Sequence, residues 1–252
     1  MDSKSIEDVL MQKFLKCYDR KIPYEKEFVD NIGQRLSELR VCENVITGNN
    51  VTGKFVIPNP PDGKYYILLS KSIQNTDEYF ETFFHELTHL YDYKMFSERY
   101  CNGEDEKIVE DKNWLEFYFW SEYRAKQVGY EFYYDHLEMC GKSSYENSAE
   151  CIASTNYINQ LHNVKEMHKK FKSGNVSCEK YLYEIFHFFG RVKAWEKVVR
   201  KSLNNIMLDF ELFASTLPEH YKLYKKMNII SSAENVHKIK DYLSMYLHIC
   251  LE

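Results

Sequence analysis

The segment from Asn75 to Met95 constrains this chain most strongly, because it contains neither proline nor glycine and can form one uninterrupted helix. Large apolar side chains recur along it at helical spacing, which predicts a buried amphipathic helix. Asn75 or Thr76 can cap its start, and two acidic residues follow in the first turn, where negative charge stabilises a helix. The recurring apolar residues are Phe80, Phe83, Phe84, Leu87, Leu90 and Tyr91.

This helix carries His85-Glu86-Leu87-Thr88-His89, a His-Glu-x-x-His pattern. Helical residues four apart lie on one face with their Cβ atoms about 5–6 Å apart, so His85 and His89 can point at one metal ion. Zn²⁺ binds imidazole nitrogen at about 2.0–2.1 Å, which suits this spacing. Glu86 is rotated by about 100° from His85, and we expect it beside the metal as a general base rather than as a ligand. A metal would also supply partners for polar groups that are costly to bury alone.

A catalytic zinc usually has three protein ligands and one open position. The extended pattern with a third histidine is absent, because Asp92 and Met95 stand where it requires glycine and histidine. The best third ligand is Glu122, which lies on a helical stripe of otherwise apolar or small residues. Ala125 and Gly129 on the same stripe would let a second helix approach closely.

The sequence leaves open both the charge partner of Glu122 and the identity of the third ligand. A carboxylate on an apolar face needs a positively charged partner, and for Glu122 this can be the metal, Arg124 or a more distant basic residue. Glu116 and Glu110 are fallback ligands, and Asp92, one turn after His89, is a weaker one. The sequence therefore predicts a zinc site without fixing its third ligand.

The pattern at His85–His89, followed by Glu122-Tyr123-Arg124-Ala125, resembles gluzincin-type zinc peptidases. More narrowly it resembles the ImmA/IrrE family of small bacterial and phage metallopeptidases, which pairs a His-Glu-x-x-His helix with a Glu-x-x-Ala segment on the next long helix. The resemblance implies His85, His89 and Glu122 as zinc ligands. It also implies Glu86 as the catalytic base of a peptidase that cuts a protein substrate, such as a repressor or another regulator. It covers about residues 50–135.

The composition limits the remaining function classes. Of the 252 residues, 44% are hydrophobic and 16% aromatic, which excludes a disordered chain or a coiled coil. A net charge of −5 argues against nucleic acid as a partner, because phosphate binding needs concentrated positive charge. The longest apolar run, Tyr65–Leu69, is far shorter than the about 20 residues that span a bilayer. We expect a cytoplasmic protein that binds a protein or peptide substrate; the sequence carries no signal for its oligomeric state.

Two further features support an intracellular location. The first eight residues are acidic and contain no apolar segment typical of a secretory signal. The 7 cysteines are odd in number and include no Cys-x-x-Cys pair, which favours reduced thiols over a disulfide scaffold. Short basic clusters at Lys169-Lys170 and Lys225-Lys226 are expected to be solvated helix faces.

The patterns on either side of the metal helix predict an α+β fold that is predominantly helical. Residues 5–18 and 24–40 are predicted helices, the second with Phe28, Ile32, Leu36 and Leu39 on one stripe. Residues 54–57 and 65–70 are predicted strands, separated by a turn at Pro58–Gly63. We expect either strand 65–70 or its neighbour to be an exposed edge that docks substrate, or else to pack in the core.

We place a boundary near Gly141–Ser144. Residues 1–142 would form a zincin-like metallopeptidase core with a small sheet and an active-site helix, and residues 143–252 an all-helical region, either separate or part of one compact domain. Tyr157, His162 and His187 in that region are candidate donors to a developing oxyanion, and nothing in the sequence ranks them. The alternative function is a catalytically silent zinc-binding sensor or interaction protein that keeps the zincin fold.

Overall fold

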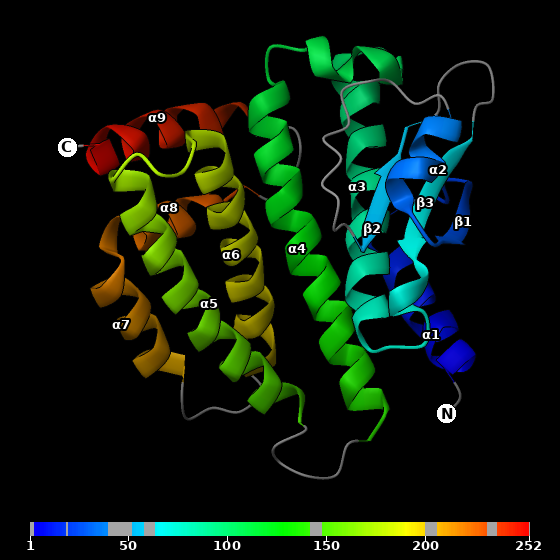
Figure 1. The fold of residues 1–252 in the computed structure, drawn as a ribbon, viewed down its shortest axis with the longest axis horizontal. Helices are drawn as coiled ribbons and strands as arrows, with labels where there is room; N and C mark the ends of the chain where they lie inside the picture. Colours follow the sequence, from blue (N-terminus) through cyan, green and yellow to red (C-terminus); the bar gives the residue numbers. More distant parts are fainter. Residues whose placement is uncertain are drawn as a thin grey trace. The chain divides into compact units, whose positions relative to one another are not determined.

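The structure, a computed structural model, describes residues 3–18, 20–39, 52–57, 64–141, 148–199, 206–230 and 236–251. These residues are mostly helical and include one small sheet (Figure 1), so the predicted helix-rich α+β class is confirmed. The chain divides into two compact units. The first comprises Met1–Asp111 and Val128–Ser143, and the second Lys112–Gln127 and Ser144–Glu252. The boundary expected from the sequence, between residues 142 and 143, would have assigned residues 112–127 to the first unit, whereas the structure assigns them to the second.

The first unit combines a three-stranded sheet with helices on both of its faces. Its elements in chain order are α1 (Ser3–Leu15), β1 (Tyr24–Val29), α2 (Ile32–Glu38), β2 (Gly53–Val56), β3 (Tyr65–Ser70), α3 (Glu78–Tyr100) and the second half of α4 (Trp114–Met139). Short 3₁₀ helices, η1 (Lys71–Ile73) and η2 (Asp105–Glu110), precede and follow α3.

The strand order is β1-β3-β2, with β1 parallel and β2 antiparallel to β3. Alternate residues of β3 face opposite sides, as the two-residue period of a strand requires. Ile67 and Leu69 join the larger apolar cluster, which includes Phe83 and Phe84 of α3. Leu68 joins the smaller cluster on the face covered by α2. The sheet thus supports α3 on one side and is closed by α2 on the other.

One prediction about this region was wrong. Residues 24–29, predicted as the start of a helix, form strand β1, because they pair along their whole length with β3; only α2 keeps the predicted helical stripe. The strand 65–70 is confirmed, but it is the central strand and cannot be the exposed edge. Its neighbour β2 is an edge strand of the sheet. The predicted turn at 58–63 lies outside the described residues.

Helix α3 begins slightly later than expected. Its N-cap is Asp77, and Asn75, an expected cap, instead adopts a left-handed backbone with φ 70°. Asp77 uses its carboxylate to bind α4: its Oδ1 lies 2.9 Å from His136 Nε2. The ring of His136 stacks on Phe80, with centroids 3.8 Å apart. The start of α3 is therefore fixed to the second half of α4 within the first unit.

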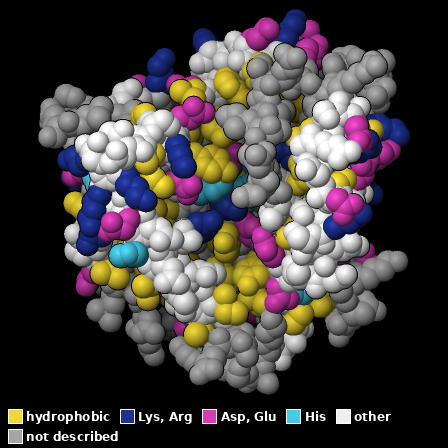
Figure 2. All heavy atoms as spheres, in the orientation of Figure 1, with side chains coloured by type: hydrophobic (Ala, Val, Ile, Leu, Met, Phe, Trp, Pro, Cys, Tyr) yellow, Lys and Arg dark blue, Asp and Glu magenta, His cyan; other side chains and the backbone are white. Residues whose placement is uncertain are grey.

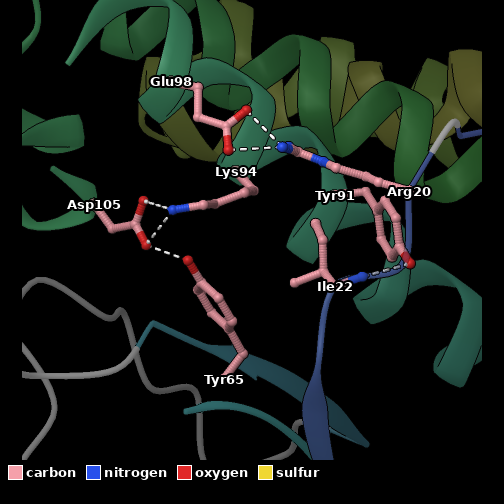
Figure 3. A network of polar contacts seen from close by, with 7 residues as sticks. All are labelled: Arg20, Ile22, Tyr65, Tyr91, Lys94, Glu98 and Asp105. Carbon is pink, nitrogen blue, oxygen red and sulfur yellow. Dashed lines mark hydrogen bonds and ion pairs between the residues drawn. The ribbon is translucent and has the colours of Figure 1, made fainter. Parts of the chain in front are cut away.

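Polar contacts fix the segment before β1 and the sheet to the second half of α3 (Figure 3). Arg20 Nη1 donates to both carboxylate oxygens of Glu98 at 2.7 Å, and Ile22 N donates to Tyr91 Oη at 3.2 Å. Asp105 accepts from Tyr65 of β3 and forms an ion pair with Lys94 of α3. These contacts hold the sheet in a defined position against the helix that carries the metal pattern.

The second unit is helical, as predicted for the C-terminal region. It contains the first half of α4, then α5 (Ala149–Lys172), α6 (Cys178–Val199), α7 (Ile206–Thr216), α8 (Pro218–Met227) and α9 (His237–Leu251). Aromatic stacking forms much of its core: Tyr157 lies on Trp195 with centroids 4.3 Å apart, and Phe171 lies on Tyr181 at 4.2 Å. Pro218 occupies the first turn of α8, where its missing N–H costs nothing.

Acidic and basic side chains are interspersed over the described atoms of the face in Figure 2. Lys169 pairs with Glu166 and Lys222 with Glu219, each at 2.7 Å on a helix surface. Such exposed pairs contribute only about 0–1 kcal/mol each. The expected solvated face at Lys169-Lys170 is confirmed, since both residues are exposed on α5. Among the described residues, none of the helices has the length and apolar character needed to cross a bilayer.

Candidate metal centre

The two histidines of the metal pattern converge on one point. His85 and His89 lie one turn apart on α3, and their Nε2 atoms are 3.1 Å from each other. The rings are nearly perpendicular, at 87°. Two zinc–nitrogen bonds of about 2.0–2.1 Å at a tetrahedral angle would hold the nitrogens about 3.3 Å apart. The pair therefore fits a single divalent cation closely.

The surrounding helix explains why these polar groups are held so firmly. Both faces of this part of α3 are covered, so His85 and His89 are each only 7% exposed and Glu86 8%. Neighbouring Phe83, Phe84 and Leu87 are fully buried. Dense packing restricts side-chain rotamers, which keeps the imidazoles in a fixed orientation before any metal binds.

Glu86 lies beside this pair and is anchored by the edge strand. Its Oε2 accepts a hydrogen bond from the Phe55 backbone N–H at 2.6 Å, and its Oε1 lies 4.0 Å from His85 Nε2. Ser70 N donates to Thr52 O, so by antiparallel alternation the N–H of Phe55 points away from β3. One carboxylate oxygen is thus held by the backbone while the other faces the imidazole of His85. Glu86 takes the expected place, next to the histidines.

Close approach of β2 to α3 depends on Gly53. A Cβ added there would lie 2.4 Å from Thr82 Cγ2 and 3.0 Å from Glu86 Cγ. Any side chain would therefore push β2 away from the helix, and with it the Phe55 N–H that holds Glu86. The glycine keeps the edge strand within hydrogen-bonding distance of Glu86.

Gly129 likewise permits the close approach of α4 to α3. A Cβ on Gly129 would lie 2.6 Å from the Glu81 carbonyl oxygen and 3.2 Å from His85 Cβ. The close packing of the second half of α4 on α3 thus occurs directly behind His85. The sequence anticipated this close approach from the small residues on the Glu122 stripe.

Replacing Gly129 by alanine is expected to lower the free energy of unfolding by about 1–3 kcal/mol, because backbone atoms of α3 would have to move. Gly33→Ala in α2 is the matched control, since its nearest neighbour is Asn31 Oδ1 at an ordinary 3.4 Å. There alanine should stabilise by up to about 1 kcal/mol through helix propensity. Urea unfolding of both variants measures the difference; equal effects would show that Gly129 is not a close contact.

In the second unit, Glu122 pairs with His187 of α6. Glu122 Oε2 lies 2.7 Å from His187 Nε2, and the two residues are 8% and 6% exposed. Burial lowers the pKa of His187 to about 4, although the hydrogen bond to Glu122 acts in the opposite direction. The imidazole is therefore neutral near pH 7, and its Nε2–H donates to the carboxylate. The sequence left the partner of Glu122 open, and within this unit His187 is one such partner.

Gly190 determines how closely α6 approaches α4. A Cβ there would lie 2.4 Å from the Tyr123 carbonyl oxygen and 2.7 Å from Lys126 Cβ. Gly190 lies one turn after His187 on α6, and Tyr123 directly follows Glu122 on α4. The packing of Gly190 on Tyr123 brings the two helices close enough for the 2.7 Å contact between His187 and Glu122.

The remaining candidate ligands and oxyanion donors differ in their burial and in their contacts. Glu110 is exposed in η2, whereas Glu116 is 7% exposed and Asp92 is fully buried. Of the three oxyanion candidates, His162 is exposed on α5 and Tyr157 stacks in the core on Trp195. The third candidate, His187, contacts Glu122, which the sequence assigned to the metal.

Buried side chains that could hold a metal ion occur in both units: His85 in the first, and Glu122 and His187 in the second. His89 adds a second imidazole beside His85. Imidazole nitrogen and carboxylate oxygen are both ligands that suit zinc and other borderline divalent cations. The chain matches no protein-family model, no curated protein and no solved structure.

Proposed function

We propose that the chain is a zinc-dependent peptidase of the gluzincin type, similar to the ImmA/IrrE family, that hydrolyses peptide bonds of a protein substrate such as a regulator or repressor. The zinc ligands would be His85, His89 and Glu122. The observation that carries the proposal is the convergence of the two imidazoles with a buried carboxylate beside them. Burying His85, Glu86 and His89 together among apolar side chains is costly unless they have a common partner, which a metal ion would supply.

Helix periodicity supports Glu122 as the third ligand. Glu122 and Gly129 are seven residues apart on α4, which is close to two turns of about 3.6 residues. They therefore lie on the same face of the helix. In the first unit, Gly129 of that face packs against His85. A carboxylate on this face is well suited to complete the ligand set.

In the proposed hydrolysis the metal ion, Glu86 and the Phe55 backbone have separate roles. A bound zinc ion would supply a Lewis acid that polarises the peptide carbonyl and lowers the pKa of water. Glu86 accepts a proton from the attacking water on its carboxylate and later delivers it to the leaving amine. The Phe55 N–H keeps this carboxylate oriented throughout, because it donates to Oε2.

A second candidate function is a catalytically silent zinc-binding sensor or interaction protein. It requires a fourth protein ligand, which would close the coordination sphere as in structural zinc sites. A closed site leaves no position for water or substrate. The two functions therefore differ in the coordination number that the protein itself provides.

The proposed activity is tested by mapping cleavage in a peptide library derived from a bacterial proteome. We expect internal cleavages with the zinc-loaded protein, their loss when a chelator removes the metal, and their recovery when zinc is restored. Cleavage that persists without metal would contradict the proposal. A library left intact by fully zinc-loaded protein would favour the silent zinc-binding alternative.

A further inference from the structure

Helix α6 brings one histidine to the carboxylate that we propose as the third zinc ligand. His187 Nε2 lies 2.7 Å from Glu122 Oε2. The ring of Tyr183, one turn earlier on α6, lies against the imidazole with centroids 4.0 Å apart. Gly190, one turn later, holds the helix against the Tyr123 carbonyl. The imidazole is thus packed against Tyr183 of its own helix, on a helix that lies close to α4.

The distance indicates a hydrogen bond rather than two ligands of one metal ion. Nitrogen and oxygen ligands on a tetrahedral zinc, with bonds of about 2.0–2.2 Å, lie about 3.3 Å apart. The 2.7 Å between His187 and Glu122 is instead typical of a charge-assisted N–H···O bond. Because a carboxylate only accepts, the imidazole must be the donor.

We propose that His187 is a positioning residue, which holds the Glu122 carboxylate in the orientation needed to bind the metal; this inference rests on the proposed zinc site. The Nε2–H of His187 donates to Oε2 and so fixes the direction of the carboxylate on α4. Outer-shell partners of this kind orient metal ligands. His187 lies outside the region that resembles known zinc peptidases, so the resemblance does not imply its role.

The first test is zinc affinity, measured by competition with a chromophoric chelator. His187→Leu removes the donor and is expected to weaken zinc binding by about 10–100-fold, whereas His187→Gln retains an N–H donor and should recover much of the loss. His220→Gln is the matched control, because His220 is another buried imidazole of the second unit, 2% exposed. We expect this control to bind zinc like the wild type. Thermal unfolding of the metal-free proteins separates folding from metal binding.

The second measurement is X-ray absorption at the zinc edge, which counts imidazole ligands. We expect two imidazoles in the wild type and also two in His187→Gln. Three in the wild type and two in the variant would make His187 a ligand and overturn the inference. Wild-type affinity in His187→Leu would overturn it as well, with the zinc site intact. Absence of zinc binding by the wild type would instead remove the proposed function, and this inference with it.

Discussion

Glu86→Gln is expected to reduce peptide hydrolysis by about 10²–10⁴-fold while zinc stays bound at the wild-type ratio. Glutamine has nearly the same shape and its carbonyl oxygen can still accept the Phe55 N–H, so the contact between β2 and α3 should survive. What it loses is the ability to accept a proton from water at neutral pH. Initial cleavage rates and zinc content, measured on the same preparation, test both parts.

Glu86→Ala is the informative comparison. It removes the acceptor as well as the base and leaves the buried Phe55 N–H without its carboxylate, which should cost about 1–3 kcal/mol of stability. Glutamine should therefore be folded and inactive, and alanine both inactive and less stable. Full cleavage by Glu86→Gln would exclude Glu86 as the base. A partner-dependent effect that survives this change would favour the silent zinc-binding function.

His85→Ala is expected to lower zinc affinity by more than the about 10–100-fold attributed to outer-shell partners, because a direct ligand is lost. His89→Ala should behave alike, since the two Nε2 atoms converge at 3.1 Å. Metal content after dialysis, determined by mass spectrometry, gives the result. His162→Ala is the control, because this histidine is exposed on α5 and should not affect zinc. Equal zinc in His85→Ala and the wild type would contradict the assignment.

The sequence predicted correctly those features that depend on residues close together in the chain. The His85–His89 spacing predicted two imidazoles on one face, and α3 presents them that way, because helical geometry is local. The strand 65–70 was predicted with its observed bounds for a similar reason: a short apolar run flanked by turn residues reports burial on both faces.

Strand β1 shows where local patterns failed. Its residues Tyr24–Val29 alternate charged and aromatic side chains too irregularly to suggest a strand, and the helical stripe beginning at Phe28 continued into α2. Pairing with β3 decides its conformation, and that partner lies about 40 residues later in the chain. Tertiary pairing of this kind overrides weak local preference.

The contacts that complete the site could not be derived from spacing. Phe55 meets Glu86 only because of strand register, and His187 meets Glu122 only because Gly190 permits close helix packing. One signal was nevertheless available. His187 stands in an aromatic helix between Phe186 and Phe188, as Glu122 stands on an apolar stripe, and each such polar residue needs a partner.

A crystal structure recorded at wavelengths above and below the zinc absorption edge tests the account most directly. We expect one strong anomalous peak within about 2.0–2.2 Å of His85 Nε2, His89 Nε2 and one oxygen of Glu122, with His187 bonded to the other oxygen. If the peak is absent from zinc-loaded crystals, or lies away from these three side chains, the peptidase assignment is contradicted.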